Sequence, residues 1–258
     1  MEIQFYKYQG TGNDFIILDN RTSLYDGLTE HQINTMCDRR FGIGADGLML
    51  LGLADGFDFS MKYYNADGKE GSMCGNGGRC LVRFAYDMGI IKDSYHFIAV
   101  DGPHDATIQP NGNISLKMQD VSNIEFTAND VVLNTGSPHF IRFVDEVKNI
   151  DVFQEGKNIR YNDVYKEKGI NVNFVEKTGD SIQLRTYERG VEDETLSCGT
   201  GATAAAIAFA QNTGFNKVPV KVQGGELEIS FNRTNQHQCD NIWLTGPAMF
   251  VFKGTFLV

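Results

Sequence analysis

An internal repeat constrains the fold of this chain of 258 residues more than any other feature of its sequence. The segment TGNDFI at 11–16 resembles TGSPHFI at 135–141, and CGNGG at 74–78 resembles CGTGA at 198–202. The spacing of the landmarks agrees, because 62 positions separate the glycine of the first motif from the cysteine of the second in both copies. A period this long indicates a duplicated domain rather than a solenoid, so the sequence predicts two homologous halves.

Local patterns predict many strands and few helices. Segments that alternate apolar and polar residues, or that are rich in β-branched and aromatic residues, predict the strands. The helices are predicted at 29–38, with Thr29 as the N-cap, after Gly75 as far as Met88, and after Gly199 as far as Gln211, while the segment 152–158 is ambiguous. Because strands and helices do not alternate regularly, the predicted fold class is α+β.

The charge balance and the cysteine content disfavour several classes of protein. Acidic residues number 33 and basic residues 23, and the formal charge of −10 disfavours a nucleic-acid partner. No apolar run is long enough for a membrane helix, and the first residues lack the pattern of a signal peptide, so we expect a cytoplasmic protein without a membrane partner. The five cysteines are expected to be free thiols, with Cys37, Cys80 and Cys239 as small buried apolar residues.

Cys74 and Cys198 differ from the other cysteines because each precedes a Gly-x-Gly sequence that begins a predicted helix. The first turn of a helix has unpaired N–H groups and a partial positive charge, so it binds carboxylates and favours a nearby thiolate. Inversion of an amino-acid α-carbon needs a base on one face and an acid on the other, and a thiolate and a thiol can exchange these roles. If the two halves face each other, the cleft between them is the expected substrate site.

Eight motifs, in one order along nearly the whole chain, resemble those of the diaminopimelate epimerase family: GTGNDF at 10–15, FGIGADG at 41–47, YNADG at 64–68, CGNGGRC at 74–80, SPH at 137–139, NVNF at 171–174, YERG at 187–190 and SCGTGA at 197–202. The resemblance implies that Cys74 and Cys198 are the catalytic acid/bases and that Glu188 and His139 support the cysteines and the substrate's α-amino group. The residues implied to bind substrate are Gly75, Asn76, Gly199 and Thr200 at the reacting carboxylate, and Asn13, Asn65, Asn171 and Arg189 elsewhere. The chain departs from the family pattern at Gly47, where some members carry glutamine, and at Ser137, where many carry asparagine.

The resemblance also implies an architecture and an activity. Each pseudo-symmetric half would be a mostly antiparallel sheet around a central helix, with residues 1–119 and a returning strand at 247–258 in one half and residues 120–246 in the other. The active site would lie in the cleft between the halves. The activity would be the cofactor-independent epimerisation of LL-2,6-diaminopimelate, a small-molecule substrate, to its meso isomer in lysine and peptidoglycan-precursor biosynthesis. The expected assembly is a homodimer.

Other interpretations start from the same residues. The chain could be a racemase of another amino acid, such as a relative acting on histidine or hydroxyproline, a redox sensor that uses Cys74 and Cys198, or a binding module without catalysis. A dinucleotide pattern at 42–47 lies in the wrong structural context, because a helix-like segment precedes it and a strand-like segment follows. No cysteine or histidine spacing predicts a metal site. The remaining assignments are turn caps for Asp14 and Asp46, and pairing with surface acids for Arg39, Arg40 and Arg79.

Overall fold

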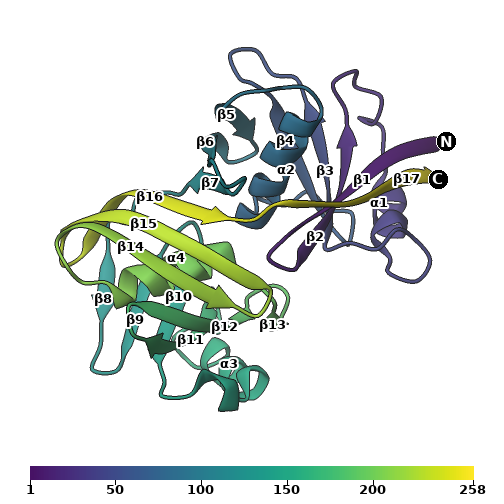
Figure 1. Ribbon diagram of the computed structural model, residues 1–258. Coiled ribbons are helices and arrows are strands. Elements are labelled where there is room, and N and C mark those ends of the chain that lie inside the picture. Colours follow the sequence, from purple (N-terminus) through teal and green to yellow (C-terminus); the bar gives the residue numbers. More distant parts are fainter. The chain divides into compact units, whose positions relative to one another are not determined.

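The computed structural model describes residues 1–258 and divides the chain into two compact units. Unit 1 comprises Met1–Leu116 together with Gly246–Val258, and unit 2 comprises Lys117–Thr245. Each unit contains a sheet and a central helix (Figure 1), so the predicted α+β class is confirmed. No helix is both long and apolar enough to cross a membrane.

Eight strands form the sheet of unit 1. In the order of their pairing they are β17 (Met249–Leu257), β1 (Glu2–Gly10), β2 (Asn13–Asp19), β3 (Gly47–Gly52), β4 (Ser60–Asn65), β5 (Ser94–Ala99), β6 (Gly102–Ile108) and β7 (Ile114–Lys117). The pairs β2–β3 and β4–β5 are parallel, and the others are antiparallel. Helix α1 (Glu30–Cys37) begins at a capping box in which Thr29 is the N-cap, as predicted. Helix α2 (Gly75–Asp87) packs against β1, β2 and β3.

Unit 2 is built in the same way. In the order of their pairing its strands are β8 (Ile124–Phe126), β9 (Asp130–Asn134), β10 (Pro138–Phe143), β11 (Asn171–Thr178), β12 (Ser181–Glu188), β14 (Gly214–Val222), β15 (Gly225–Asn235) and β16 (Gln238–Gly246). The short β13 (Asp193–Thr195) also pairs with β12. The helical elements are η1 (Val147–Asn149), α3 (Val152–Arg160), which resolves the ambiguous segment as a helix, and α4 (Gly199–Phe209).

The two sheets share one sequence of pairings, which explains the internal repeat as a duplication of the fold. From β1 to β7 the pairs are antiparallel, parallel, antiparallel, parallel, antiparallel and antiparallel, and the pairs from β9 to β16 follow the same order. Strand β17 pairs with β1 as β8 pairs with β9, so the C-terminal strand returns to the first unit.

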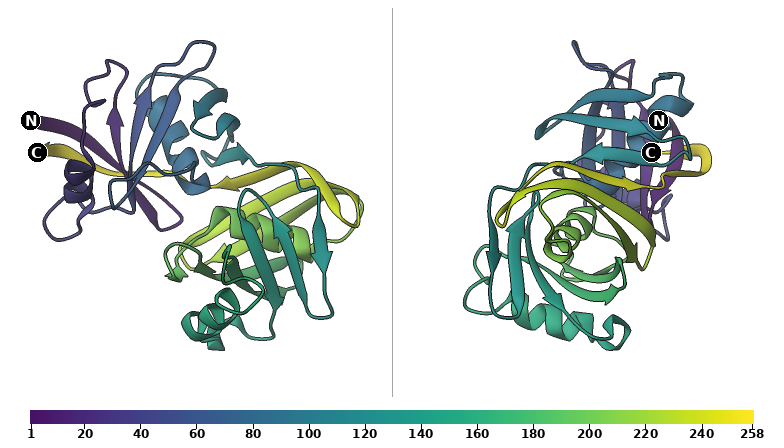
Figure 2. Two further views of the ribbon diagram at one scale, coloured as in Figure 1. Left: turned by 180° about the vertical axis from the view of Figure 1, so that it is seen from behind. Right: turned by 60° about the vertical axis from the view of Figure 1, so that its left-hand side comes forward.

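The central helix of each unit is buried because its side chains are small where the sheet approaches. In α4, every residue from Gly201 to Ala208 is buried, and the helix contacts strands β9, β10, β11, β12, β14 and β15. The right-hand view of Figure 2 shows α4 enclosed by the curved sheet of unit 2. In α2, a Cβ at Gly77 would lie only 3.1 Å from Met49 Sδ of β3. Each central helix begins directly after one of the repeated cysteines, which is its N-cap residue.

Candidate active site

Each unit presents one repeated cysteine at the N-terminus of its central helix. Cys74 is the N-cap residue of α2 and Cys198 is the N-cap residue of α4, both with extended backbone and neither with a side-chain capping hydrogen bond. The first intrahelical hydrogen bonds run from Gly78 N to Cys74 O (2.7 Å) and from Ala202 N to Cys198 O (2.9 Å). The N–H groups of the residues between therefore point out of the helix end, where they can donate to an anion.

In unit 1, the amide of Asn13 connects Cys74 to a cluster of charged side chains. Asn13 is the first residue of β2, and its Oδ1 accepts hydrogen bonds from Cys74 Sγ (3.5 Å) and Asn76 Nδ2 (3.4 Å). Its Nδ2 donates to the carboxylate of Asp46. Because an ionised carboxylate only accepts, the contact with Asp46 fixes the amide so that its oxygen faces the thiol.

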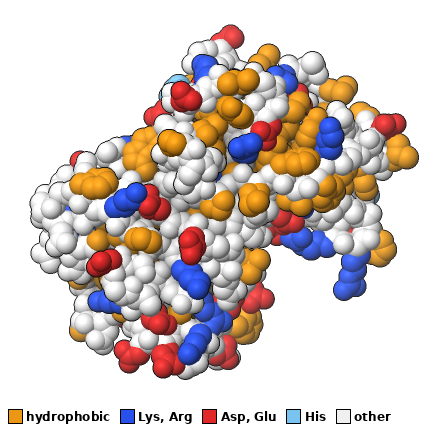
Figure 3. Space-filling view, in the orientation of Figure 1, with side chains coloured by type: hydrophobic (Ala, Val, Ile, Leu, Met, Phe, Trp, Pro, Cys, Tyr) orange, Lys and Arg blue, Asp and Glu red, His pale blue; other side chains and the backbone are white.

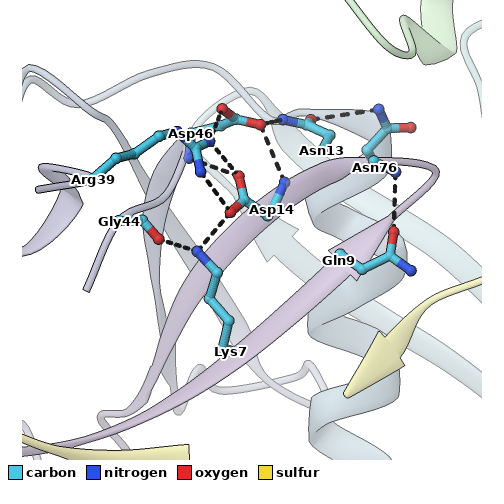
Figure 4. A network of polar contacts seen from close by, with 9 residues as sticks. Lys7, Gln9, Asn13, Asp14, Arg39, Gly44, Asp46 and Asn76 are labelled. Carbon is cyan, nitrogen blue, oxygen red and sulfur yellow. Dashed lines mark hydrogen bonds and ion pairs between the residues drawn. The ribbon is translucent and has the colours of Figure 1, made fainter. Parts of the chain in front are cut away.

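The charged cluster behind Asn13 consists of Asp46, Asp14, Arg39 and Lys7 (Figure 4). Arg39 Nη2 lies 2.7 Å from a carboxylate oxygen of both Asp14 and Asp46, and Lys7 Nζ lies 2.7 Å from Asp14. Burial raises the pKa of the Asp14 carboxyl, but hydrogen bonds from Arg39 and Lys7 outweigh it and lower this pKa to about 2. The predicted pairing of Arg39 with acids is confirmed. Asp14 and Asp46 were predicted only to cap turns, whereas their carboxylates also form the ion pairs of this cluster.

Arg79 lies wholly inside unit 1, so its predicted pairing with a surface acid is wrong. The residue is 0% exposed, and its guanidinium donates to Gly75 O (3.4 Å), Asn76 Oδ1 (3.0 Å) and Thr11 Oγ1 (3.3 Å). Its Nε has no hydrogen-bond partner, and burial lowers the pKa of the guanidinium. Arginine is rarely fully buried, so the sequence alone does not reveal this position.

In unit 2, Cys198 lies at one end of a chain of hydrogen bonds that leads into the interior. Cys198 Sγ contacts Thr200 Oγ1 (3.5 Å), which contacts His139 Nε2 (2.9 Å), and His139 Nδ1 contacts Asn173 Nδ2 (3.0 Å). Asn173 Nδ2 also donates to the main-chain oxygen of Phe140 (3.1 Å). Because that oxygen can only accept, the Asn173 amide is oriented to donate to His139. Asn173 was not among the predicted site residues, although it lies in the motif at 171–174.

The burial of His139 decides which group donates and which accepts in each of these hydrogen bonds. The residue is 0% exposed, and burial, followed by the positive charge of Arg189, lowers the pKa of His139 to about 3. The neutral ring accepts from Asn173 at Nδ1, so its proton lies on Nε2 and is donated to Thr200 Oγ1. The hydroxyl proton of Thr200 is then directed to Cys198, where it would stabilise a thiolate.

A second group of predicted residues lies near the end of β12. Arg189 N donates to Asn171 Oδ1 (2.9 Å), and the Ser137 hydroxyl accepts from Asn171 Nδ2 (2.8 Å) and Arg189 Nη2 (3.3 Å). Glu188, the last residue of β12, accepts from Thr195 Oγ1 (2.8 Å). The serine at 137 therefore joins Asn171 to Arg189, despite being shorter than the asparagine that many family members carry.

Asn65 occupies in unit 1 the position that Glu188 occupies in unit 2, because β4 and β12 hold the same place in the shared order of pairings and each residue is the last of its strand. Its side chain is exposed, and its partner across the sheet is Gly47. A Cβ at Gly47 would lie 2.5 Å from the Tyr63 ring and 2.6 Å from Tyr64 O. Packing on β4 therefore excludes the glutamine that some family members have at this position.

The other three cysteines lie in the apolar interior, which confirms their predicted role. Cys37, Cys80 and Cys239 are buried, and burial raises their pKa values to about 12, about 12 and about 11. These thiols stay protonated at neutral pH, unlike a thiol that serves as a base. No group of three or more His, Cys, Asp or Glu side chains is arranged to hold a metal ion.

Comparison with known proteins identifies the relatives of the chain. A family model described as diaminopimelate epimerase matches residues 5–124 and 131–251. The curated diaminopimelate epimerase of Flavobacterium psychrophilum is 54% identical over 256 residues, which cover 98% of this chain and 100% of that protein. The one from Chlorobaculum tepidum is 44% identical over 257 residues, which cover 95% and 98%. A solved structure of a Bacillus anthracis protein of the PhzF phenazine biosynthesis family has a TM-score of 0.76 at 15% identity, covers 100% of both chains, and shows the fold alone.

Proposed function

The chain belongs to the diaminopimelate epimerase family, so it is an isomerase with an epimerase function in lysine and diaminopimelate biosynthesis, and we propose that Cys74 and Cys198 are its two acid/base groups. The proposed reaction converts LL-2,6-diaminopimelate to the meso isomer without a cofactor, which also supplies a peptidoglycan precursor. The observation that carries the proposal is the matched position of the two thiols. Each lies at a helix N-terminus, and neither uses its sulfur to cap the helix.

One turnover moves two protons in this mechanism. The thiolate of one cysteine removes the α-proton and becomes a thiol, while the electron pair of the broken C–H bond moves into the carboxylate as an enediolate. The thiol of the other cysteine gives its proton to the opposite face of the α-carbon and becomes a thiolate. The two cysteines thereby exchange protonation states, so the reaction can run in both directions. Each positioned proton transfer contributes about 10²–10⁴-fold to the rate.

The groups proposed to donate to the reacting carboxylate are the first-turn N–H groups of each central helix. They belong to Gly75 and Asn76 in α2 and to Gly199 and Thr200 in α4. Backbone N–H groups at a helix N-terminus are already oriented before the substrate binds, so they stabilise the developing enediolate without further rearrangement. This differential stabilisation lowers the barrier to removing a proton from a carbon that is otherwise a very weak acid.

The remaining predicted residues receive binding and positioning roles in the proposal. Arg189 suits the distal carboxylate, because a planar guanidinium can donate two parallel hydrogen bonds. Its side chain already bonds to Ser137, which in turn accepts from Asn171. The amides of Asn13 and Asn65 would complete the contacts to the polar ends of the substrate, and Glu188 would accept from the α-ammonium group. His139 acts through Thr200 as a donor toward Cys198.

We also propose that the enzyme is a cytoplasmic homodimer. Strand β17 exposes four consecutive apolar residues, Met249, Phe250, Val251 and Phe252, each at least 44% exposed. Figure 3 shows apolar side chains gathered on the visible face along this strand, and such patches are typical of association surfaces. Light scattering should therefore give twice the chain mass of 28.7 kDa, and Phe252→Glu should lower the measured mass. A wild-type mass of one chain would contradict the dimer.

The proposed cytoplasmic location is supported by the five free cysteines, which are typical of a reducing compartment.

The test of the proposed function is α-proton exchange in deuterium oxide. The full chain is incubated with LL-diaminopimelate under reducing conditions without added cofactor, and the double variant Cys74→Ala/Cys198→Ala is the matched control. We expect deuterium at the α-carbon together with the meso isomer, and neither with the control. Absence of exchange would contradict the proposed substrate and lead to a screen of other amino acids, including histidine and hydroxyproline. Absence of racemisation across that screen would overturn the two-thiol mechanism.

A further inference from the structure

We propose that Arg79 is a positioning residue of the unit 1 half-site, whose buried positive charge stabilises an anion at the N-terminus of α2. The anion is the thiolate of Cys74. The inference rests on the proposed function only for the role of this thiolate as a catalytic base. Its basis in the structure is independent of the substrate, because it concerns an arginine that the fold buries without a counter-ion.

The surroundings of Arg79 contain hydrogen-bond acceptors but no compensating charge. Its three partners, the main-chain oxygen of Gly75 and the side-chain oxygens of Asn76 and Thr11, are all neutral. Its Nε is buried without a partner. A buried charge without a counter-ion is among the most destabilising features that a protein interior can contain. An anion bound next to the guanidinium would compensate its positive charge and so remove this energetic cost.

Only one ionisable neighbour can supply a negative charge within the unit. The ionisable groups whose charges act on the guanidinium are Cys80 and Cys74. Burial raises the pKa of Cys80 to about 12, so that thiol remains neutral. The other charged groups on the packed strands are already paired, since Lys7 and Asp14 pair with each other and Asp87, at the far end of α2, pairs with Arg83. Cys74 is therefore the group whose ionisation the arginine favours.

The side chain of Arg79 also has the required direction. Long side chains on a helix point back toward its N-terminus, and this one donates to Gly75 and Asn76, the first two residues of α2. These are the residues assigned to the carboxylate. The positive charge of the guanidinium thus adds to the partial positive charge of the helix end.

Unit 2 shows that the hydrogen bonds alone do not require a charge. Thr203 follows Cys198 by the same five positions that separate Arg79 from Cys74, and Thr203 Oγ1 donates to Gly199 O (2.9 Å). This is the contact that Arg79 makes with Gly75 O in α2. A neutral hydroxyl satisfies the carbonyl in one unit, so the guanidinium in the other unit supplies something more than a donor.

The experiment measures the pH dependence of alkylation at both cysteines of the same full-length chain. Wild type, Arg79→Met, Arg79→Lys and the matched control Thr203→Val are treated with iodoacetamide between pH 5 and pH 10, and Cys74 and Cys198 are resolved by peptide mass spectrometry. In Arg79→Met we expect the alkylation midpoint of Cys74 to rise by about 1 pH unit or more while that of Cys198 stays unchanged. Arg79→Lys should keep the Cys74 midpoint near that of wild type, and Thr203→Val should leave it unchanged.

Turnover provides the second readout. In Arg79→Met, kcat/KM should fall by about tenfold or more, in proportion to the lost thiolate at a fixed pH. An unchanged Cys74 midpoint in a folded Arg79→Met protein would overturn the inference and leave Arg79 a packing role. If that variant does not fold, Arg79→Gln, which keeps the donors and removes the charge, takes its place. A chain that lacks epimerase activity but shows the Cys74 shift would contradict the proposed function and uphold the role of Arg79.

Discussion

The two half-sites share a backbone and differ in the side chains that support each sulfur. In unit 1, Cys74 faces the amide oxygen of Asn13, and an ion-pair network holds this amide in place. The buried guanidinium of Arg79 bonds to the first two residues of α2. In unit 2, Cys198 faces the Thr200 hydroxyl at the end of a relay of neutral groups. Duplication has preserved the position of a thiol at a helix N-terminus, while the groups around the thiol have diverged into a buried guanidinium in one unit and a neutral hydrogen-bonded relay in the other. We propose that these groups favour the ionised thiol by charge in unit 1 and by hydrogen-bond direction in unit 2.

The largest effect should come from removing either sulfur. Cys74→Ala and Cys198→Ala should each abolish inversion, because one face of the α-carbon then lacks its proton donor or acceptor, and substrate affinity should fall much less. Stereoisomer assays by chiral chromatography, with isothermal titration for binding, separate the two effects. Undiminished turnover in either variant would show that the half-sites are not both needed, and the comparison between them would lose its functional meaning.

An intermediate effect is expected from reversing the hydrogen-bond direction in unit 2. In Asn173→Asp, the carboxylate accepts from His139 Nδ1, so Nε2 becomes an acceptor and takes the Thr200 proton away from Cys198. Loss of a hydrogen bond to a charged sulfur lowers kcat by about 10- to 100-fold. The alkylation midpoint of Cys198 should rise, and that of Cys74 should not.

The matched control at this position is Asn173→Ser, which removes the amide without introducing an acceptor charge. It should shift the Cys198 midpoint less than Asn173→Asp does. Equal shifts in both variants, or a shift at Cys74, would mean that Asn173 acts on packing and not on the direction of the relay.

The smallest effect concerns acid stability, which should distinguish the units. The pKa of His139 is about 3 in the folded chain, against about 6.5 unfolded. The unfolded state therefore binds a proton first as pH falls, and this one group costs unit 2 about 1.4 kcal/mol of stability per pH unit from about 6.5 downward. In unit 1, the pKa of Asp14 is about 2, so its stabilisation is complete above about pH 4 and is lost only as pH falls further.

Urea unfolding at each pH, followed by pulsed hydrogen exchange at one fixed pH, would resolve the two units. We expect unit 2 to weaken between pH 6.5 and 4 while the Asp14 contribution to unit 1 is constant. His139→Gln should flatten the slope of unit 2 in that range. An unchanged slope in this variant would refute the assignment of the acid sensitivity to His139.

The sequence predicts those parts of the molecule that depend on local pattern. The repeat, the two central helices and Thr29 as an N-cap all follow from spacing and composition, and the structure confirms them. Strand β6 is not predicted, because its segment GPHDATI carries a proline and polar residues that are typical of a turn. Its extended form depends on pairing with β5 and β7, which no local pattern encodes.

The unpredicted residues of the candidate site share a different cause. Asp46 reaches Asn13 across 33 positions, and Asn173 reaches His139 across 34. Such contacts exist only after the sheets have formed, whereas a motif shows which residue types are present and not which way an amide faces. Arg79 shows this most clearly, because an arginine within an amphipathic segment is predicted to be exposed, whereas the fold buries this one completely.

The return of β17 to unit 1 sets an order of events during synthesis. Strand β17 pairs with β1 from Glu2–Leu257 to Gln9–Met249. The β1 edge that pairs with β17 therefore stays unpaired until β17 has been synthesised. Unit 2 is continuous, and at typical elongation rates the ribosome needs on the order of 10 s to translate it. During that interval β1 presents an unpaired edge, a template for pairing with other chains. A chain released before Gly246 therefore keeps that edge open, because Gly246–Val258 contains the strand that closes it.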